Sequence, residues 1–134
     1  MANKVVNEIK ADGGHPLTNY DSVELGNKIV STAINSFGRT DIIINNVGIL
    51  RDVMLLKMTD LNWQLIFKAH MKGTYSVTKA AWPYMNKQSY GLVIVTSSNA
   101  ATYDNLGQTN YSAARLELSG FCKSLAEEPR LQYS

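Results

Sequence analysis

Hydrophobic residues form two short continuous runs in this chain, and the segments around them have helical periodicity. The runs are residues 41–46, Asp-Ile-Ile-Ile-Asn-Asn, and residues 92–96, Leu-Val-Ile-Val-Thr. Each run follows a turn that contains glycine, and neither alternates between apolar and polar positions. Such runs are typical of parallel strands covered on both faces. The pattern therefore predicts two buried strands.

Amphipathic patterns predict helices on either side of the first run. Apolar side chains recur at every fourth position over residues 25–37, and Asp21 or Ser22 is positioned to cap that helix. A longer pattern runs over residues 59–85. Gly73 near its centre predicts an irregularity, and Pro83 near its end predicts a kink.

The two ends of the chain add further elements. A last helix is expected from about residue 110 to residue 128, where a proline follows. At the start, residues 5–9 are consistent with the tail of a helix, residues 13–14 with a glycine turn, and residues 16–20 with a short strand. Strands that alternate with helices predict an α/β fold with a parallel sheet.

Composition restricts the classes of protein that this chain can belong to. It has 134 residues, which is enough for one domain, with 45% hydrophobic and 18% charged residues. The net charge of +2 is too even to indicate a nucleic-acid surface, and no apolar run approaches the ~20 residues that span a bilayer. A single cysteine cannot form an intrachain disulfide, which fits a reducing intracellular compartment. We therefore expect neither a nucleic-acid partner nor a membrane.

Three residues suggest a chemistry: Ser98, Tyr111 and Arg115. A tyrosine hydroxyl ordinarily ionises near pH ~10, so its use as an acid/base at neutral pH needs a cation close by. A cation four residues later lies on the same face of a helix, and a serine hydroxyl can orient a substrate oxygen. The alternative from spacing alone is a surface tyrosine followed by a solvated arginine.

The surrounding motifs distinguish a catalytic tyrosine from a surface tyrosine at this position. Residues 45–48 are Asn-Asn-Val-Gly, residues 96–98 are Thr-Ser-Ser, and residues 111–115 are Tyr-Ser-Ala-Ala-Arg. In this order and at this spacing they resemble the motifs of the short-chain dehydrogenase/reductase family, and the resemblance covers residues 3–128. It implies that residues 1–134 are a single incomplete domain with a partial doubly wound, Rossmann-like parallel sheet that lacks the first two and the last strands.

Four further segments are similar to a narrower group. They are residues 48–52, 70–73, 80–82 and 105–111. They resemble the (3R)-hydroxyacyl-CoA dehydrogenase units of peroxisomal multifunctional enzymes type 2, a group also called 17β-hydroxysteroid dehydrogenase type 4. This resemblance implies NAD-dependent oxidation of an acyl-CoA-type substrate in fatty-acid β-oxidation. It also implies a peroxisomal location and a homodimer formed through the long helix and the last helix.

The resemblance also implies catalytic roles for four residues. Ser98 would polarise the substrate carbonyl, and Tyr111 would be the acid/base. Arg115 would stand where the family has lysine. His70 would support the proton relay at a position where most of the superfamily has asparagine, although a histidine within a long helix can equally be a structural residue.

Cofactor contacts follow from the same resemblance. Asp21 would contact the adenine ring of NAD, although it could instead cap a helix. Asn45 would tie neighbouring strands together. The remaining cofactor-binding positions would be Asn46, Val47, Gly48, Tyr111 and Arg115. No metal site is expected.

The sequence departs from the family pattern in ways that place activity in doubt. Arginine keeps the charge of lysine, but its planar head is bulkier and directs its donors elsewhere, so we expect a severe loss of activity from Arg115. Val47 replaces a smaller alanine, which is expected to be tolerated. The glycine-rich pyrophosphate loop is absent, because Gly13-Gly14 opens no helix. We also expect the chain to lack the strands and the substrate lid that, in the family, follow the position of residue 128.

Three functions therefore remain open from the sequence. The first is the NAD-dependent dehydrogenase, and the second is a catalytically inactive, truncated remnant that serves as a dimerisation or binding module. The third is a carbonyl or steroid reductase of the same superfamily. The choice between NAD and NADP and the acyl chain length are open as well. Because the missing strands leave open sheet edges, we expect the isolated chain to be marginally stable, rearranged or associated.

Overall fold

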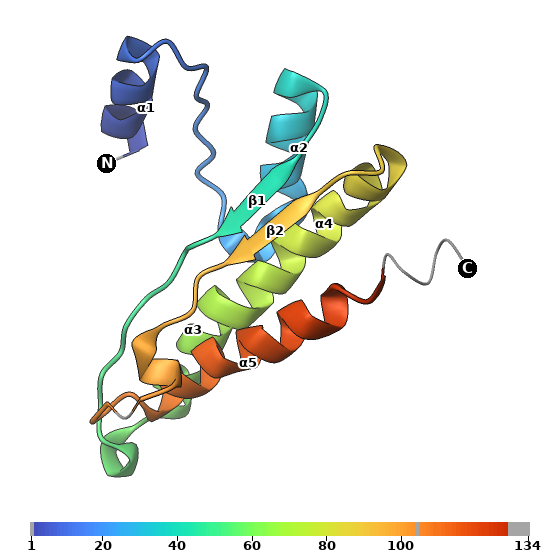
Figure 1. Cartoon of the computed structure of the whole chain (residues 1–134). Coiled ribbons are helices and arrows are strands. Elements are labelled where there is room, and N and C mark those ends of the chain that lie inside the picture. Colours follow the sequence, from blue (N-terminus) through green and yellow to red (C-terminus); the bar gives the residue numbers. More distant parts are fainter. Residues whose placement is uncertain (1, 104, 129–134) are drawn as a thin grey trace.

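The computed structural model describes residues 2–103 and 105–128 (Figure 1). The helices are α1 (Ala2–Ala11), α2 (Gly26–Phe37), α3 (Asp60–Phe67), α4 (Gly73–Lys87) and α5 (Thr109–Leu125). The strands are β1 (Ile42–Asn45) and β2 (Leu92–Val95). Short helical turns complete the order: η1 (Val23–Leu25), η2 (Leu55–Lys57), the π-helical segment η3 (Lys68–Lys72) and η4 (Asn99–Ala101).

The two predicted strands pair with each other in parallel. Ile42 lies opposite Leu92, and Asn45 lies opposite Val95. The segment α3–η3–α4 makes the crossover between them. The predicted α/β fold with a parallel sheet is therefore confirmed, and each strand is shorter than predicted.

The core lies between one face of this sheet and helices α2 and α4. It consists of Val30, Ile43, Val77, Ala81 and Met85. Partly buried side chains from both helices and from β2 complete it. The predicted apolar stripe of residues 25–37 is thus buried near its middle, while Leu25 and Phe37 at its two ends are exposed.

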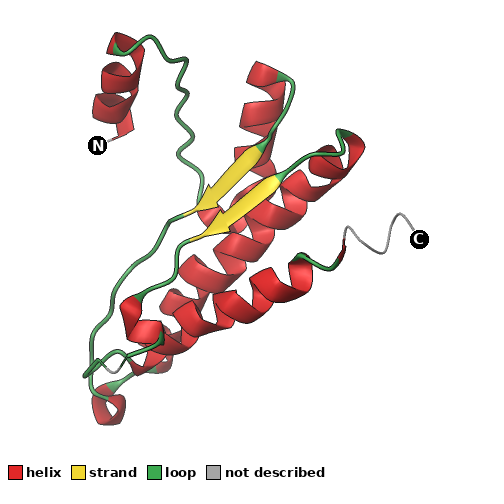
Figure 2. Ribbon diagram, in the orientation of Figure 1, coloured by secondary structure: helices red, strands yellow, loops and turns green. Residues whose placement is uncertain are grey.

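The opposite face of the sheet is uncovered within the described residues. Ile44 is 63% exposed and Ile42 is 52% exposed, and their partners Leu92 and Ile94 are exposed as well. The prediction that both strands are covered on both faces is therefore wrong for this part of the chain. The reason is visible in Figure 2, where the helices that pack on the strands lie behind the sheet and no helix of the described residues covers its front face.

The long helix forms as predicted and is irregular at its centre. Thr59 caps α3 by accepting a hydrogen bond from the Asn62 amide at 3.2 Å. The π-helical segment η3 ends directly before Gly73, which confirms the predicted irregularity. Pro83 lies inside α4. Single π-helical turns often occur at functional sites, and this one carries His70.

The two ends of the described chain differ from the predictions. The strand predicted at residues 16–20 is not formed: this segment is extended but pairs with no strand. Its side chains bond elsewhere, since the Asn19 amide donates to the Thr32 hydroxyl of α2 at 2.9 Å. Helix α5 ends three residues before the predicted residue 128, and the proline expected to stop it lies outside the described residues.

Gly13 and Gly14 end a helix and do not begin one. Their amides donate to the Lys10 and Ile9 carbonyls at 3.0 Å and 2.9 Å, so both lie in the turn that closes α1. This agrees with the sequence-based interpretation of a glycine turn. As for membranes, none of the helices in the described ranges is both long and apolar enough to cross one.

Candidate active site and adjoining pockets

Tyr111 and Arg115 lie one turn apart on α5 and contact each other. The Arg115 Cζ atom lies 5.3 Å from the centre of the Tyr111 ring, over its face. The same guanidinium donates through Nη1 to the Thr96 carbonyl at 2.5 Å, beyond the end of β2. Arg115 is only 6% exposed. The contact predicted from the four-residue spacing is therefore present, but the cation is directed at the ring face and at a backbone oxygen.

His70 approaches the same tyrosine from the long helix. Its ring centre lies 5.3 Å from that of Tyr111, at an interplanar angle of 80°. The buried ring is held through Nε2, which lies 2.9 Å from the Ile49 carbonyl and 3.3 Å from the Ile49 amide. Burial lowers the pKa of His70, the hydrogen bond to Ile49 opposes this, and the nearby Arg115 charge lowers the pKa further. The imidazole is therefore held in its neutral form.

Two polar atoms of this cluster have no hydrogen-bond partner among the described residues. They are His70 Nδ1 and Arg115 Nε, and both are buried. Gly48 lies against both residues: a Cβ atom there would come within 2.4 Å of His70 Cε1 and 2.5 Å of Arg115 Nη2. Glycine is required at this position because any side chain would displace the cluster. An unpaired buried polar atom is costly, so this cluster is a strong candidate for a functional site.

Ser98 lies beside this cluster at the start of η4. Its hydroxyl oxygen accepts a hydrogen bond from the Ala100 amide at 3.3 Å, and its backbone is extended. The η4 turn packs against α5, and the Ser97 hydroxyl donates to the Arg115 carbonyl at 3.2 Å. The segment that follows β2 is thus fixed to the helix that carries Tyr111. Among the described residues, neither the Ser98 hydroxyl hydrogen nor the Tyr111 hydroxyl is engaged in a hydrogen bond.

A cavity of about 620 Å³ lies between η4 and the start of α5, and its lining residues include neither Ser98 nor Tyr111. We call it the η2–η4 pocket, since η2 and η4 form two of its walls. Its lining residues are Met54, Leu55, Ala100, Ala101, Thr102, Tyr103, Asn105, Leu106, Gly107, Thr109 and Ser112. Sequence reasoning missed this pocket. The apolar run Met54-Leu55-Leu56 in a loop after the first strand was the available signal.

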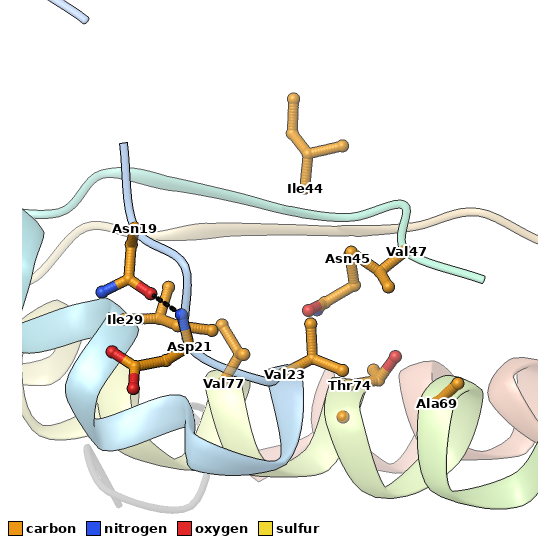
Figure 3. Close-up of a pocket in the computed structure, with 11 residues that line it drawn as sticks. Asn19, Asp21, Val23, Ile29, Ile44, Asn45, Val47, Ala69, Thr74 and Val77 are labelled. Carbon is orange, nitrogen blue, oxygen red and sulfur yellow. Dashed lines mark hydrogen bonds between the residues drawn. The ribbon is translucent and has the colours of Figure 1, made fainter. Parts of the chain in front are cut away.

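A second pocket, of about 250 Å³, lies under the carboxyl end of β1 (Figure 3). Asp21 and Val47, two of the predicted cofactor residues, both line it, together with Val23, Ala69 and Thr74. We call it the Asp21–Val47 pocket. Ser22, and not Asp21, caps the first turn by accepting from the Glu24 amide at 3.4 Å. Asp21 instead forms an ion pair with Lys28 at 3.5 Å.

Two other predicted cofactor residues lie elsewhere. The Asn46 carbonyl oxygen of the side chain accepts a hydrogen bond from the Thr96 hydroxyl at 2.8 Å, which links the ends of the two strands. Gly48 faces His70 and Arg115, as described above. Asn45, predicted to tie neighbouring strands together, accepts a hydrogen bond through its carbonyl from the Thr96 amide at 3.1 Å, and its side chain donates to Thr78 of α4 at 3.1 Å.

The described part of the chain shows no group of three or more His, Cys, Asp or Glu side chains that could hold a metal ion. The glycine-rich turn that would bind a pyrophosphate does not occur between residues 2 and 128 either, because Gly13 and Gly14 close α1. The site therefore consists of the cluster His70, Tyr111 and Arg115, the serine segment beside it and the two pockets.

Comparison with known proteins gives consistent relatives. Residues 2–132 match the family described as short chain dehydrogenase. The sequence is 58% identical over 127 residues to the peroxisomal hydratase-dehydrogenase-epimerase of Neurospora crassa, covering 95% of this chain and 14% of that protein. It is 50% identical over 129 residues to the peroxisomal multifunctional enzyme type 2 of Mus musculus, covering 96% of this chain and 18% of that protein.

A solved structure agrees with these relatives. The structure of full-length peroxisomal multifunctional enzyme type 2 from Drosophila melanogaster superposes with a TM-score of 0.84 and 42% identity, covering 95% of this chain and 22% of that one. The chain therefore spans less than a third of the length of each of these three proteins. The described residues form part of the doubly wound parallel-sheet fold of that structure.

Proposed function

The chain belongs to the short-chain dehydrogenase family, and we propose that it supplies the dehydrogenase site of an enzyme that oxidises (3R)-hydroxyacyl-CoA in peroxisomal fatty-acid β-oxidation. The observation that carries the proposal is the environment of Tyr111. Its ring is contacted by the buried imidazole of His70 and by the buried guanidinium of Arg115. The names of the relatives from Neurospora crassa and Mus musculus support the peroxisomal setting.

In this proposal Tyr111 accepts the proton of the substrate hydroxyl while its own phenol proton leaves through the relay that His70 supports. Its own hydroxyl is unengaged within the described residues, and a positioned acid/base typically contributes roughly 10²–10⁴-fold to a rate. Ser98 donates its hydroxyl hydrogen to the substrate oxygen and so orients it. Arg115 supplies a positive charge beside the phenol, and His70, held neutral by burial, receives or passes on a proton through its unpartnered Nδ1.

The Asp21–Val47 pocket fits the adenine end of a nicotinamide dinucleotide. Its walls are mainly apolar side chains from η1, β1 and the long helix, with the Asp21 carboxylate among the polar groups that line it. Flat heteroaromatic groups bind in such clefts, where a few polar side chains fix their orientation. We propose NAD as the cofactor, which would supply the hydride acceptor when bound.

The η2–η4 pocket is proposed as the substrate site. Ala100 and Ser112, which are within two residues of Ser98 and Tyr111 in the sequence, line it, and Met54, Leu55 and Leu106 provide apolar surface to it. An acyl chain would bury that surface, at about 25 cal/mol per Å² removed from water. We propose that the substrate extends from this pocket so that its oxidised carbon reaches the hydroxyl groups of Ser98 and Tyr111.

A specific observation favours a second candidate, a catalytically inactive binding or dimerisation module. The Arg115 guanidinium is directed to the Thr96 carbonyl and to the face of the Tyr111 ring. A lysine ammonium is a compact charge that could instead approach the phenol oxygen. In this alternative the fold and the pockets are retained while proton transfer is lost.

Self-association is proposed for either function. Trp63 and Phe67 stack at 4.9 Å between ring centres, and a pocket on the outer face of the long helix joins them to Met71 and Tyr75. Trp63 and Tyr75 remain 39% and 45% exposed. We propose that a homodimer buries this surface together with that of α5.

The test of the proposed function is a steady-state assay of the full-length protein that carries this chain. We expect (3R)-hydroxyacyl-CoA-dependent reduction of NAD, and a loss of roughly 10²-fold or more with Tyr111→Phe. Tyr90→Phe, at an exposed tyrosine before β2, is the matched control and should leave the rate unchanged. Activity that persists in Tyr111→Phe would exclude Tyr111 as the acid/base. A folded protein without any turnover would favour the inactive module.

A further inference from the structure

Two loops that are distant in the sequence form the walls of the η2–η4 pocket. One wall contains Met54 and Leu55, and the other contains Asn105, Leu106 and Gly107. The residue that joins them is Gln108, which comes directly before α5 and three residues before Tyr111. It does not line the pocket itself.

Gln108 is buried, with 8% of its surface exposed, and both ends of its amide are used. Its Nε2 donates to the Asp52 carboxylate at 2.9 Å, across 56 positions of sequence. Its Oε1 accepts a hydrogen bond from the Asn105 side-chain amide at 2.7 Å. Hydrogen bonds to a charged group are among the stronger ones in proteins. The side chain is therefore held between the two walls.

A backbone hydrogen bond reinforces the same junction. The Val53 amide donates to the Gly107 carbonyl at 2.8 Å, so the residue after Asp52 pairs with the residue before Gln108. Met54 and Leu55 follow immediately and enter the pocket. The separation of the two walls is thus set by two adjacent bonds, one from a side chain and one from the backbone.

A simpler role for Gln108 would be to cap α5, but its side chain bonds to no amide of that helix. Gln108 contributes to the start of this helix only through its backbone, because its carbonyl accepts the first hydrogen bond of the helix, from the Ser112 amide at 2.8 Å. If the Gln108 side chain turned to cap α5, the Asp52 carboxylate would lose its hydrogen bond from Gln108. The side chain therefore serves the contact between the loops.

We propose that Gln108 is a positioning residue that, with Asp52, clamps the two walls of the η2–η4 pocket and sets the width available to the substrate. Its assignment to substrate binding rests on the proposed function, whereas the clamp itself is a property of the fold. Gln108 touches no reacting atom; it acts through Met54 and Leu55 on one side and through the Asn105–Gly107 loop on the other.

The test uses four forms of the full-length protein that carries this chain: wild type, Gln108→Glu, Asp52→Asn and the double variant. In wild type the Gln108 amide donates to the Asp52 carboxylate. In Gln108→Glu two carboxylates face each other at that place and repel, so the two walls of the pocket should move apart. In Asp52→Asn the amide of Gln108 can still donate to an oxygen, so little should change. In the double variant the amide at position 52 can donate to the carboxylate at position 108, so the clamp should close again.

Hydrogen exchange at the Val53 amide reports on the clamp without any need for activity. Exchange should be faster in Gln108→Glu by roughly tenfold or more, since loss of a hydrogen bond to a charged group is typically worth that factor. It should return to within about threefold of the wild-type rate in the double variant. Equal exchange in all four forms, or no recovery in the double variant, would overturn the clamp.

Kinetics report on the link to the substrate. We expect Gln108→Glu to raise KM for the acyl-CoA several-fold, with a smaller change in kcat and an unchanged Kd for NADH, and the double variant to recover. If exchange at Val53 behaves as expected but wild type has no turnover, the clamp stands and the proposed function fails. If wild type turns over and KM is unaffected in Gln108→Glu, the role of the clamp in substrate binding is wrong.

Discussion

Arg115 contacts the ring of Tyr111 and the Thr96 carbonyl, and its Nη2 atom occupies the space where a side chain at Gly48 would be. Its contact with Tyr111 could be predicted from sequence, because residues four apart share a helix face. Its bond to Thr96 could not, because that bond depends on how α5 packs against the end of β2. Gly48 is explained only by the structure, which places His70 and Arg115 where a side chain would be.

Replacement of Arg115 by lysine should increase activity. A lysine ammonium cannot span the ring face and the Thr96 carbonyl together, and it is free to approach the phenol oxygen. We expect kcat of the full-length protein to rise about tenfold or more, within the range that acid/base catalysis supplies. Arg39→Lys, an exposed arginine paired with Asp41, is the control and should change nothing. An unchanged or lower kcat in Arg115→Lys would show that the arginine is not what limits turnover.

The buried histidine should make stability depend on pH in a defined direction. The fold lowers the pKa of His70 below its ordinary value of about 6.5, chiefly by burial. As the pH falls below 6.5, His70 therefore binds a proton in the unfolded chain before it does so in the folded chain. The contribution of the neutral His70 to the free energy of unfolding is complete above pH 6.5. It is lost progressively as the pH falls from 6.5 toward the lowered pKa of the folded state.

Thermal melts of the full-length protein between pH 7.5 and 5.5 would measure this, at about one unit to either side of the ordinary histidine pKa. We expect Tm to fall with pH in wild type and the slope to decrease in His70→Asn. His15→Asn is the matched control, because His15 is exposed, and it should keep the wild-type slope. A slope that is the same in His70→Asn would contradict the burial of a neutral imidazole.

At the scale of elements, the sequence predicted the helices and the two paired strands because their periodicity is local. It failed at residues 16–20, because an extended stretch becomes a strand only when another strand lies beside it, and the described residues place none there. It also failed to find the η2–η4 pocket, because the bond between Asp52 and Gln108 joins residues that are far apart in sequence. Contacts between elements, in contrast to the elements themselves, leave little local signal.

The long helix carries the surface through which we expect self-association. Trp63→Glu should place a charge in that surface and raise the dissociation constant of the dimer roughly tenfold or more, as expected for a central aromatic residue. Tyr84→Glu, on the same long helix but lining a different pocket, is the matched control and should leave the dimer intact. Light scattering over a range of concentrations would measure both. A monomer at every concentration in wild type would contradict the proposal.

At the scale of the whole molecule, the described residues form a two-stranded sheet, and the solved structure that they resemble is several times longer. Each strand has one neighbour within the described chain, and one face of the sheet presents Ile42, Ile44, Leu92 and Ile94 to solvent. An exposed apolar face of this kind marks an interaction surface or a liability for aggregation. The 134 residues by themselves should therefore be much less stable than the corresponding segments are within the longer relatives that they match.

Unfolding of the isolated 134-residue chain would measure this directly. We expect a broad transition that depends on protein concentration, with association at micromolar concentrations, because the open strand edges and the apolar face remain unpaired. The full-length protein, in which additional chain can cover this face, serves as the comparison. A sharp two-state melt of a dilute monomer would contradict this expectation.

The central claim is that Ser98, Tyr111 and the cluster around Arg115 form a working dehydrogenase site. The most direct measurement is transfer of deuterium from C3 of a labelled (3R)-hydroxyacyl-CoA to the nicotinamide ring in a single turnover of the full-length protein, followed by mass spectrometry. A single turnover detects even a slow enzyme. We predict that the label reaches the nicotinamide in wild type, faster in Arg115→Lys, and not measurably in Tyr111→Phe. Absence of transfer in both wild type and Arg115→Lys, in protein that is folded and binds NADH, would contradict the account.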